Sequence, residues 1–145
     1  MSYKGKFNIK NIDKYQGDHK NIIYRSLWER KFMVFCDENK NILEWSSEEI
    51  IIPYISPIDN KIHKYYVDFW LKIQTKKEIT EYLIEIKPLK ECIKPNINKK
   101  NLSKKDIEQI KKWEINKEKW KYANIFAKEN NIKFKILTEH HLGIK

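Results

Sequence analysis

Two apolar runs that each contain isolated charged residues constrain the fold of this chain more than any other feature. The first run, Tyr65–Leu71, contains Asp68, and the second, Tyr82–Lys87, contains Glu85 and Lys87. Apolar runs of this length predict buried strands. A lone charge in a buried strand is costly unless it is paired or bound to a metal. These three charged residues are therefore candidates for a site.

The segment between the two runs predicts how they pair. Gln74–Glu78 is polar and short enough for a hairpin. Pairing residues whose numbers sum to 153 places Asp68 opposite Glu85 and Tyr66 opposite Lys87. Because strand side chains alternate between faces, all four lie on one face of the sheet. Two carboxylates and a lysine then converge on one point of an otherwise apolar sheet.

Composition bounds the class of protein. A chain of 145 residues with 41% hydrophobic residues is most simply one globular domain with a real core. Its net charge of +10 indicates a polyanionic partner, for which nucleic acid is the commonest choice. Only Arg25 and Arg30 are arginine, and an excess of Lys, Asn and Ile is also what A+T-rich codons produce. The charge therefore supports nucleic-acid binding, and codon bias is the competing explanation.

Cysteine usage and hydropathy bear on the compartment. Cys36 and Cys92 are far apart and lack a CxxC partner, which argues against a disulfide framework and a zinc site and favours a reducing compartment. The first residues have no apolar signal region, and no stretch approaches transmembrane length. We expect an intracellular protein with no membrane partner.

The order of the expected elements predicts a mixed sheet. Residues 1–24 are expected to form a basic N-terminal arm laid over the domain or its ligand, and residues 25–145 the domain itself. Within the domain we expect a helix over 26–38, an apolar run at 42–45, a meander of three strands from 49 to 87, a helix from 103 with a break near Asn116, and a last strand over 132–137. A strand that returns through helices should pair in parallel after a right-handed crossover. The prediction is a mixed α/β sheet covered by helices on both faces.

The paired carboxylates suggest divalent-metal chemistry. Mg²⁺ binds through one or two carboxylates together with waters and substrate phosphate. Asp68, Glu85 and the backbone carbonyl of Ile86 would form such a set of ligands, and Lys87 would orient or deprotonate a water or stabilise a phosphate. Taken alone, a Glu-x-Lys pair on a strand is most often a solvated face. Asp68, one hairpin upstream, strengthens the metal interpretation.

Three further charged residues have competing interpretations. Ser26-x-x-Glu29 has the pattern of a capping box, in which Glu29 reaches back to Ser26. Glu29 also lies at the rim of the apolar helix stripe, from which it could reach the sheet face that carries Asp68. Without other knowledge, capping has the better support. Either Glu48 or Glu49 could line the same site as an accessory residue, although solvent exposure is the default at the start of a strand.

The stretch from Lys94 to Lys121 contains ten lysines against four acids, with Trp113 and Trp120 among them. One interpretation is an amphipathic helix with a lysine-rich solvated face and tryptophans in the core. The other is a surface that follows the phosphates of DNA. The candidate DNA-binding residues are Lys104, Lys105, Lys111, Lys112, Lys119 and Arg25.

The set Glu29, Asp68 and Glu85-Ile86-Lys87 resembles the PD-(D/E)XK nuclease superfamily, whose core runs αβββαβ. The chain is more closely similar to the head-completion nucleases of large contractile-tailed phages, and its core also resembles TnsA-type transposon end-cleaving endonucleases. The shared motifs run through nearly the whole chain: Tyr3-Lys4-Gly5-Lys6, Lys14-Tyr15-x-Gly17-Asp18, Tyr24-Arg25-Ser26-x-Trp28-Glu29, Trp45-x-Ser47-Glu48, Ile52-Pro53-Tyr54, Ile84-Glu85-Ile86-Lys87-Pro88, Lys119-Trp120 and Phe134-x-Ile136-Leu137-Thr138-Glu139.

This resemblance implies a single-domain restriction-endonuclease-like fold and a DNA endonuclease that uses Mg²⁺, with Mn²⁺ able to substitute. It implies action on double-stranded DNA in the host cytoplasm during virion assembly, at head completion and head–tail joining. Portal, neck or tail proteins would be partners, and the chain could stay with the virion. The resemblance also favours Glu29 as the superfamily's helix acid. Val67 stands where the superfamily name has Pro, a position without metal contact.

Two alternatives remain open. The chain could be a structural head–tail joining or DNA-end-binding protein with little catalysis, or a TnsA-like transposon endonuclease. The acids of the set and Lys87 are all present, which favours an enzyme. A site that no longer catalyses would be expected to have lost one of these residues.

Overall fold

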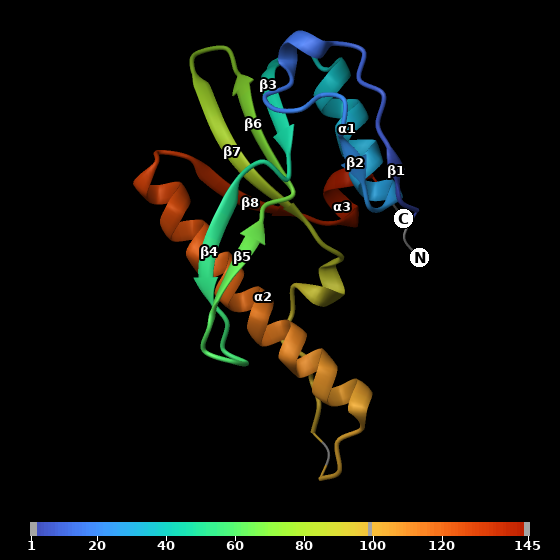
Figure 1. Ribbon diagram of the computed structural model, residues 1–145, viewed down its shortest axis with the longest axis vertical. Helices are drawn as coiled ribbons and strands as arrows, with labels where there is room; N and C mark the ends of the chain where they lie inside the picture. Colours follow the sequence, from blue (N-terminus) through green and yellow to red (C-terminus); the bar gives the residue numbers. More distant parts are fainter. Residues whose placement is uncertain (1–2, 99, 144–145) are drawn as a thin grey trace.

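A four-stranded sheet forms the centre of the molecule in the computed structural model, which describes residues 3–98 and 100–143 (Figure 1). Its strand order is β3-β6-β7-β8. β3, β6 and β7 are antiparallel neighbours, and β8 runs parallel to β7. The mixed sheet and the parallel return of the last strand are confirmed. The strands are β3 (Ile42–Ser47), β6 (Phe69–Gln74), β7 (Ile79–Ile86) and β8 (Lys133–Leu137).

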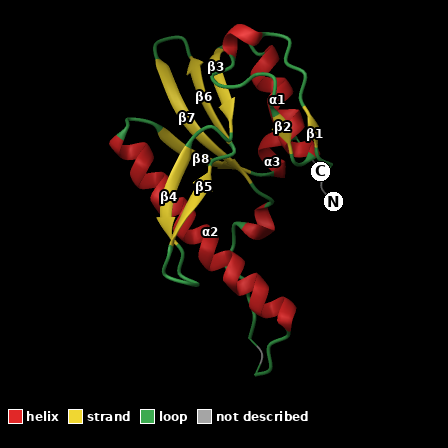
Figure 2. Cartoon of the chain, viewed as in Figure 1, coloured by secondary structure: helices red, strands yellow, loops and turns green. Residues whose placement is uncertain are grey.

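Helices cover both faces of this sheet, as expected. α1 (Leu27–Glu38) packs on the face that carries Phe69 and Ile84. α2 (Lys104–Glu129) packs on the opposite face, against Leu83 and the partly buried Trp70. Because neighbouring residues of a strand point in opposite directions, the continuously apolar strands supply two separate cores. Figure 2 shows helices on both sides of the strands. The arrangement is the mixed α/β layer structure of a restriction-endonuclease-like core.

The N-terminal segment packs against the first core. β1 (Gly5–Lys6) pairs with β2 (Ile23–Tyr24), and the 3-10 helix η1 (Ile12–Lys14) lies between them in sequence. Phe7, Tyr15 and Ile22 are buried in the cluster formed by α1 and the central sheet. The segment expected as an arm therefore contributes to the core beside α1. Residues 1, 2, 99, 144 and 145 lie outside the described part of the chain.

The expected three-stranded meander is wrong in one respect. β4 (Ile51–Ile55) and β5 (Ile62–Tyr66) form a separate two-stranded sheet, and the chain bends at Val67-Asp68 before β6 begins. Tyr66 is paired with Ile51 and thus does not lie opposite Lys87. Residues 65–71 are apolar apart from Asp68 and contain no turn residue such as Gly or Pro, so only the pairing with β4 reveals two strands.

α2 is one continuous helix, so the expected break near Asn116 is wrong. Ser103 and Asp106 form a capping box at its start, and Asn131 adopts a left-handed backbone after its end. Its first half extends beyond the sheet, where it is approached by the 3-10 helix η2 (Leu89–Glu91) (Figure 1).

α3 (Glu139–Leu142) follows β8. Within the described residues, no helix is both long and apolar enough to cross a membrane.

Candidate active site

The hairpin register brings Asp68 and Glu85 together. Phe69 pairs with Ile84 and Gln74 with Ile79, which confirms the predicted register along β6 and β7. Asp68 lies just before β6, and its Oδ2 accepts a hydrogen bond of 2.8 Å from the backbone amide of Ile86. The two carboxylates are thus next to each other where the paired strands end.

Burial makes this pair of carboxylates electrostatically unusual. Glu85 is only 5% exposed, and Asp68 is partly buried. Burial, and next the charge of neighbouring Glu85, raise the pKa of Asp68 well above its usual value. Two carboxylates in contact at such a position either share a proton or attract a cation. The geometry therefore favours positive charge at this point.

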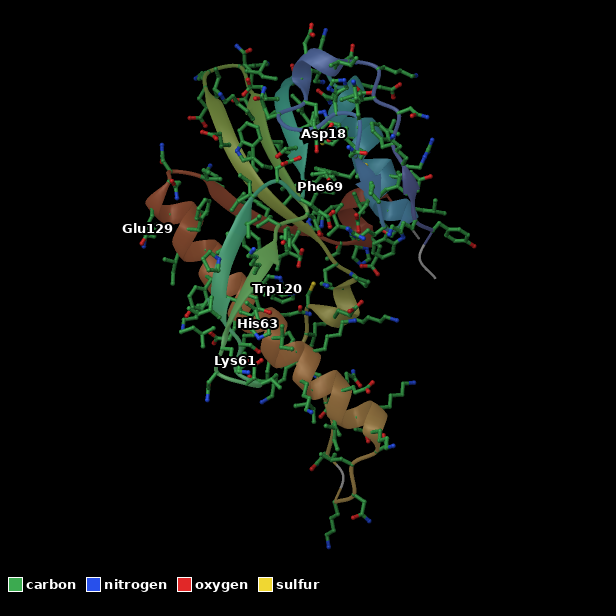
Figure 3. The ribbon with its side chains drawn as sticks, in the orientation of Figure 1. Asp18, Lys61, His63, Phe69, Trp120 and Glu129 are labelled. Atoms are coloured by element: carbon green, nitrogen blue, oxygen red, sulfur yellow. The ribbon has the colours of Figure 1, made fainter. Side chains whose placement is uncertain are left out.

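Two aromatic residues, Trp120 and Tyr65, lie beside Glu85. The indole Nε1 of Trp120, a residue of α2 that is labelled in Figure 3, donates a hydrogen bond of 3.1 Å to Glu85 Oε2. This bond holds the Glu85 carboxylate from the α2 side. The hydroxyl of Tyr65 is buried without a hydrogen bond of ordinary geometry in the described part of the chain. Its pKa is raised by burial and then by the charges of Glu85 and Asp68. Tyr65 therefore has an unused polar group directed at the carboxylate pair.

Lys119 is the lysine that α2 brings to this pair. Its Nζ lies 5.4 Å from the ring centre of Tyr65 and 5.9 Å from that of Tyr54, within the range of a cation–π interaction. Burial lowers the pKa of Lys119, whereas the charges of Glu85 and Asp68 raise it. The two rings thus hold a partly buried ammonium group near two carboxylates.

Lys87 follows β7 directly, and its backbone amide donates to the carbonyl oxygen of Leu137 at 3.0 Å. Burial lowers the pKa of Lys119 and raises that of Cys92, and the charge of Lys87 makes a smaller contribution to both, so the two lysines share one neighbourhood. The grouping of the Lys87 side chain with the carboxylates stays a prediction.

Glu29 approaches the carboxylates from the start of α1. Ser26 caps this helix by accepting the Glu29 amide at 3.2 Å. The Glu29 carboxylate accepts the amide of Arg25, not that of Ser26, so the reciprocal half of the expected capping box is wrong. Burial raises the pKa of Glu29, and the charges of Glu48 and Glu85 raise it further.

Arg25 and Glu48 form an ion pair at the edge of the site. Arg25 donates from Nε to Glu48 Oε1 at 2.8 Å and from Nη2 to Oε2 at 3.2 Å. Glu48 has a left-handed backbone with φ of 57°, and its amide donates to the carbonyl oxygen of Asp68. Glu48 thus fixes the bend before β6. It also pairs with Arg25, one of the residues expected to bind DNA.

Metal-binding capacity rests on the two carboxylates. Among residues 3–98 and 100–143, no group of three or more His, Cys, Asp or Glu residues is arranged to hold a metal ion. The backbone amide of Ile86 donates to Asp68. The role of the Ile86 carbonyl as a metal ligand stays a prediction. A pair of buried carboxylates is nevertheless the donor set that Mg²⁺ uses when phosphate and water complete its coordination.

The remaining expected DNA-binding lysines lie away from the carboxylates, on the first half of α2. Lys104, Lys105, Lys111 and Lys112 are exposed there. Lys112 Nζ is paired with Glu91 Oε1 at 2.8 Å. These four lysines form a surface distinct from the position of Lys119.

Sequence reasoning missed the contacts of Trp120 and Tyr65 with the carboxylates. Trp120 was expected on the apolar side of a helix, and Tyr65 within a buried strand. In the sequence, the shared Lys119-Trp120 motif was the signal that could have indicated these contacts. Only the packing of α2 on β7 shows that Lys119 and Trp120 both lie near Glu85.

The sequence of the chain is similar to those of known proteins. Residues 39–139 match the family model described as TnsA-like endonuclease N terminal, a stretch that contains Asp68, Glu85 and Lys119. The chain is also 41% identical to the head completion nuclease of Enterobacteria phage T4, over 98% of this chain and 95% of that protein.

Proposed function

Since the chain belongs to the TnsA-like endonuclease family, which makes it a nuclease, we propose that it is a Mg²⁺-dependent endonuclease that hydrolyses DNA phosphodiester bonds. The observation that carries the proposal is the buried pair Asp68 and Glu85, in which burial and the neighbouring carboxylate raise the pKa of Asp68. Such a pair is unfavourable by itself and favourable around a cation.

Asp68 and Glu85 would hold the metal, with the Ile86 carbonyl as a further ligand. Oxygen donors fit Mg²⁺, and Mn²⁺ accepts the same donors. When bound, the metal would neutralise phosphate charge and lower the pKa of an attacking water. Trp120 would keep Glu85 oriented through its indole hydrogen bond.

The two lysines would act on the phosphate and the water. Lys87, beside the carboxylates, would orient the water or stabilise negative charge that develops on the phosphate. Lys119 would bind the phosphate as a second cation, since the rings of Tyr54 and Tyr65 restrict its position. A fixed cation stabilises developing charge better than a mobile one.

Glu29 would assist at the outer edge of the metal site, since its carboxylate lies within the electrostatic reach of Asp68. Glu48 would act as an accessory residue by fixing the bend at Asp68 and holding Arg25. Arg25 would then contact DNA from this edge, while the lysines on the first half of α2 contact more distant phosphates.

The setting follows from the relative, whose name describes a head completion nuclease. We propose that this chain acts on double-stranded DNA in the host cytoplasm during phage assembly. Head–tail joining, contacts with portal, neck or tail proteins, and association with the virion are parts of the same proposal. A structural joining protein without catalysis is the alternative outcome.

Incubation with supercoiled DNA tests the proposal. The chain should convert it to nicked or linear DNA with Mg²⁺ and leave it intact in EDTA. Lys87→Ala should slow cleavage on the order of a hundredfold or more. Lys119→Gln should lower kcat by about tenfold to a hundredfold.

Lys121→Gln is the matched control for Lys119→Gln, because Lys121 is exposed on the same helix and approaches Glu118 at 4.0 Å. It should cleave at the wild-type rate. Absence of cleavage with both Mg²⁺ and Mn²⁺ would contradict the endonuclease and favour the structural alternative.

A further inference from the structure

A cavity separate from the carboxylate pair opens between the first half of α2 and the chain around η2. It has a volume of about 350 Å³ and includes Ile93, Pro95 and Trp113 in its lining. This volume lies near the lower end of the range of small-molecule sites, about 300–1,000 Å³. Lys90, Lys105 and Lys112, set against the single acid Glu91, give the same lining a net positive charge. An apolar wall combined with this charge suits a ligand that has a flat ring and a phosphate.

Two contacts give the cavity a defined shape. The ion pair of 2.8 Å between Lys112 and Glu91 joins α2 to η2. The ring of Trp113 packs edge-on against Trp120, with 6.3 Å between the ring centres. The aromatic wall is therefore supported from behind by the residue that hydrogen-bonds Glu85.

Asn116 supplies a polar group to this cavity. It is only 5% exposed and is one of the residues that line the cavity. Because an amide offers both a donor and an acceptor, it is suited to the edge of a nucleobase.

We propose that this cavity binds one unpaired nucleotide of the DNA substrate. The base packs against Trp113, Asn116 hydrogen-bonds its edge, and Lys105 and Lys112 neutralise the flanking phosphate. Unstacked bases are commonly bound on aromatic side chains in this way. The proposal rests on the proposed function and adds a substrate preference to it, for DNA with an unpaired nucleotide.

The position of the cavity relates this nucleotide to the site of cleavage. Trp113 and Trp120 are seven residues apart on α2, a rise of about 10 Å along the helix. This distance is about three base steps of one DNA strand. A nucleotide held at Trp113 would therefore place a phosphodiester bond a few nucleotides away near Asp68 and Glu85.

Binding of labelled DNA in EDTA tests the cavity without cleavage. Three DNAs are compared by fluorescence anisotropy: a relaxed, covalently closed duplex circle, the same circle with one bulged nucleotide, and a linear duplex with a single-stranded overhang. We expect the circle without a bulge to bind about tenfold more weakly than at least one of the others. Tighter binding of the bulged circle alone identifies a displaced internal base, and tighter binding of the overhang alone identifies a strand end.

Two variants test whether this DNA preference arises at the cavity. Trp113→Leu should remove it, but it also alters partly buried packing. Ile93→Glu is the second variant, since Ile93 is 58% exposed and the new acid would repel phosphate at the cavity. Ile125→Glu is the matched control, because Ile125 is 46% exposed on α2 outside the cavity. The preference should be lost in Ile93→Glu and kept in Ile125→Glu.

Equal affinity for the three DNAs, or a preference that survives in Ile93→Glu, would overturn the proposal. Cleavage of supercoiled DNA with Mg²⁺ separates this failure from that of the proposed function. Cleavage without any preference rejects the cavity alone, whereas a preference without cleavage supports the cavity and rejects the endonuclease.

Discussion

Buried carboxylates occur on both faces of the central sheet, but their surroundings differ. Asp37, on the α1 side, is 2% exposed, and it accepts backbone amides of Lys10 at 2.8 Å and Asn11 at 2.9 Å. On the α2 side, Asp68 accepts one backbone amide and Glu85 accepts one indole N–H in the described part of the chain. Asp37 thus has donors at both oxygens, whereas Asp68 and Glu85 face each other.

The difference indicates what each carboxylate does. Asp37 lies in the last turn of α1, where the helix dipole disfavours negative charge, and its two amide donors attach the N-terminal segment to that helix. Asp68 and Glu85 retain free oxygen lone pairs in a buried location. The first face therefore uses a carboxylate for structure, and the second keeps two carboxylates available for a cation.

The largest expected effect is on cleavage. Asp68→Asn or Glu85→Gln should reduce cleavage on the order of a thousandfold or more, because each removes a charged ligand from the proposed metal site. Neither change should lower the free energy of unfolding in EDTA, since each relieves repulsion between two buried carboxylates. Rates on supercoiled DNA and urea unfolding measure the two effects. Wild-type cleavage by either variant would make the metal assignment wrong.

Asp37→Ala should have the opposite effects: it should lower the stability of the fold and leave cleavage unchanged. It leaves the backbone amides of Lys10 and Asn11 without their charged acceptor, so the free energy of unfolding should fall by about 2–4 kcal/mol. Cleavage per folded molecule should stay near the wild-type rate at a temperature where the variant is folded. A stable but inactive Asp37→Ala variant would contradict the division between the two faces.

A smaller effect concerns pH in the absence of metal. Because the pKa of Asp68 is raised on folding, the folded state binds more protons than the unfolded state above the usual aspartate pKa of about 4. The resulting stabilisation is complete below that pH and is lost as pH rises through the raised pKa, with a slope of about 1.4 kcal/mol per pH unit. Urea unfolding in EDTA from pH 4 to pH 8 should show this decrease. Asp68→Asn should flatten the curve, and a slope that the substitution leaves unchanged would argue against a raised pKa at Asp68.

Local sequence patterns predicted much of this architecture. The register of β6 and β7 follows from two apolar runs separated by a short polar turn, and the start of α1 follows from the capping side chain of Ser26. The parallel return of β8 follows from the helical crossover. These features depend on residues close in sequence or on general rules of chain connection.

Features set by distant contacts were not predictable in the same way. The bend at Asp68 depends on pairing between β4 and β5, since the sequence is apolar on both sides of Asp68 and does not mark the bend. The hydrogen bond between Trp120 and Glu85 joins residues 35 positions apart. The same docking of α2 brings Lys119 to the carboxylates, apart from the other lysines expected to bind DNA.

Thermal unfolding with and without Mn²⁺ tests the central claim most directly, namely that Asp68 and Glu85 form a cation site. A cation that binds only the folded state raises its stability, by about 2.7 kcal/mol at a hundredfold excess over Kd. Mn²⁺ should therefore raise the Tm of the wild type and of Asp37→Asn, compared with EDTA, and leave that of Asp68→Asn unchanged. An equal rise in Asp68→Asn would contradict the account, because the cation would then bind elsewhere.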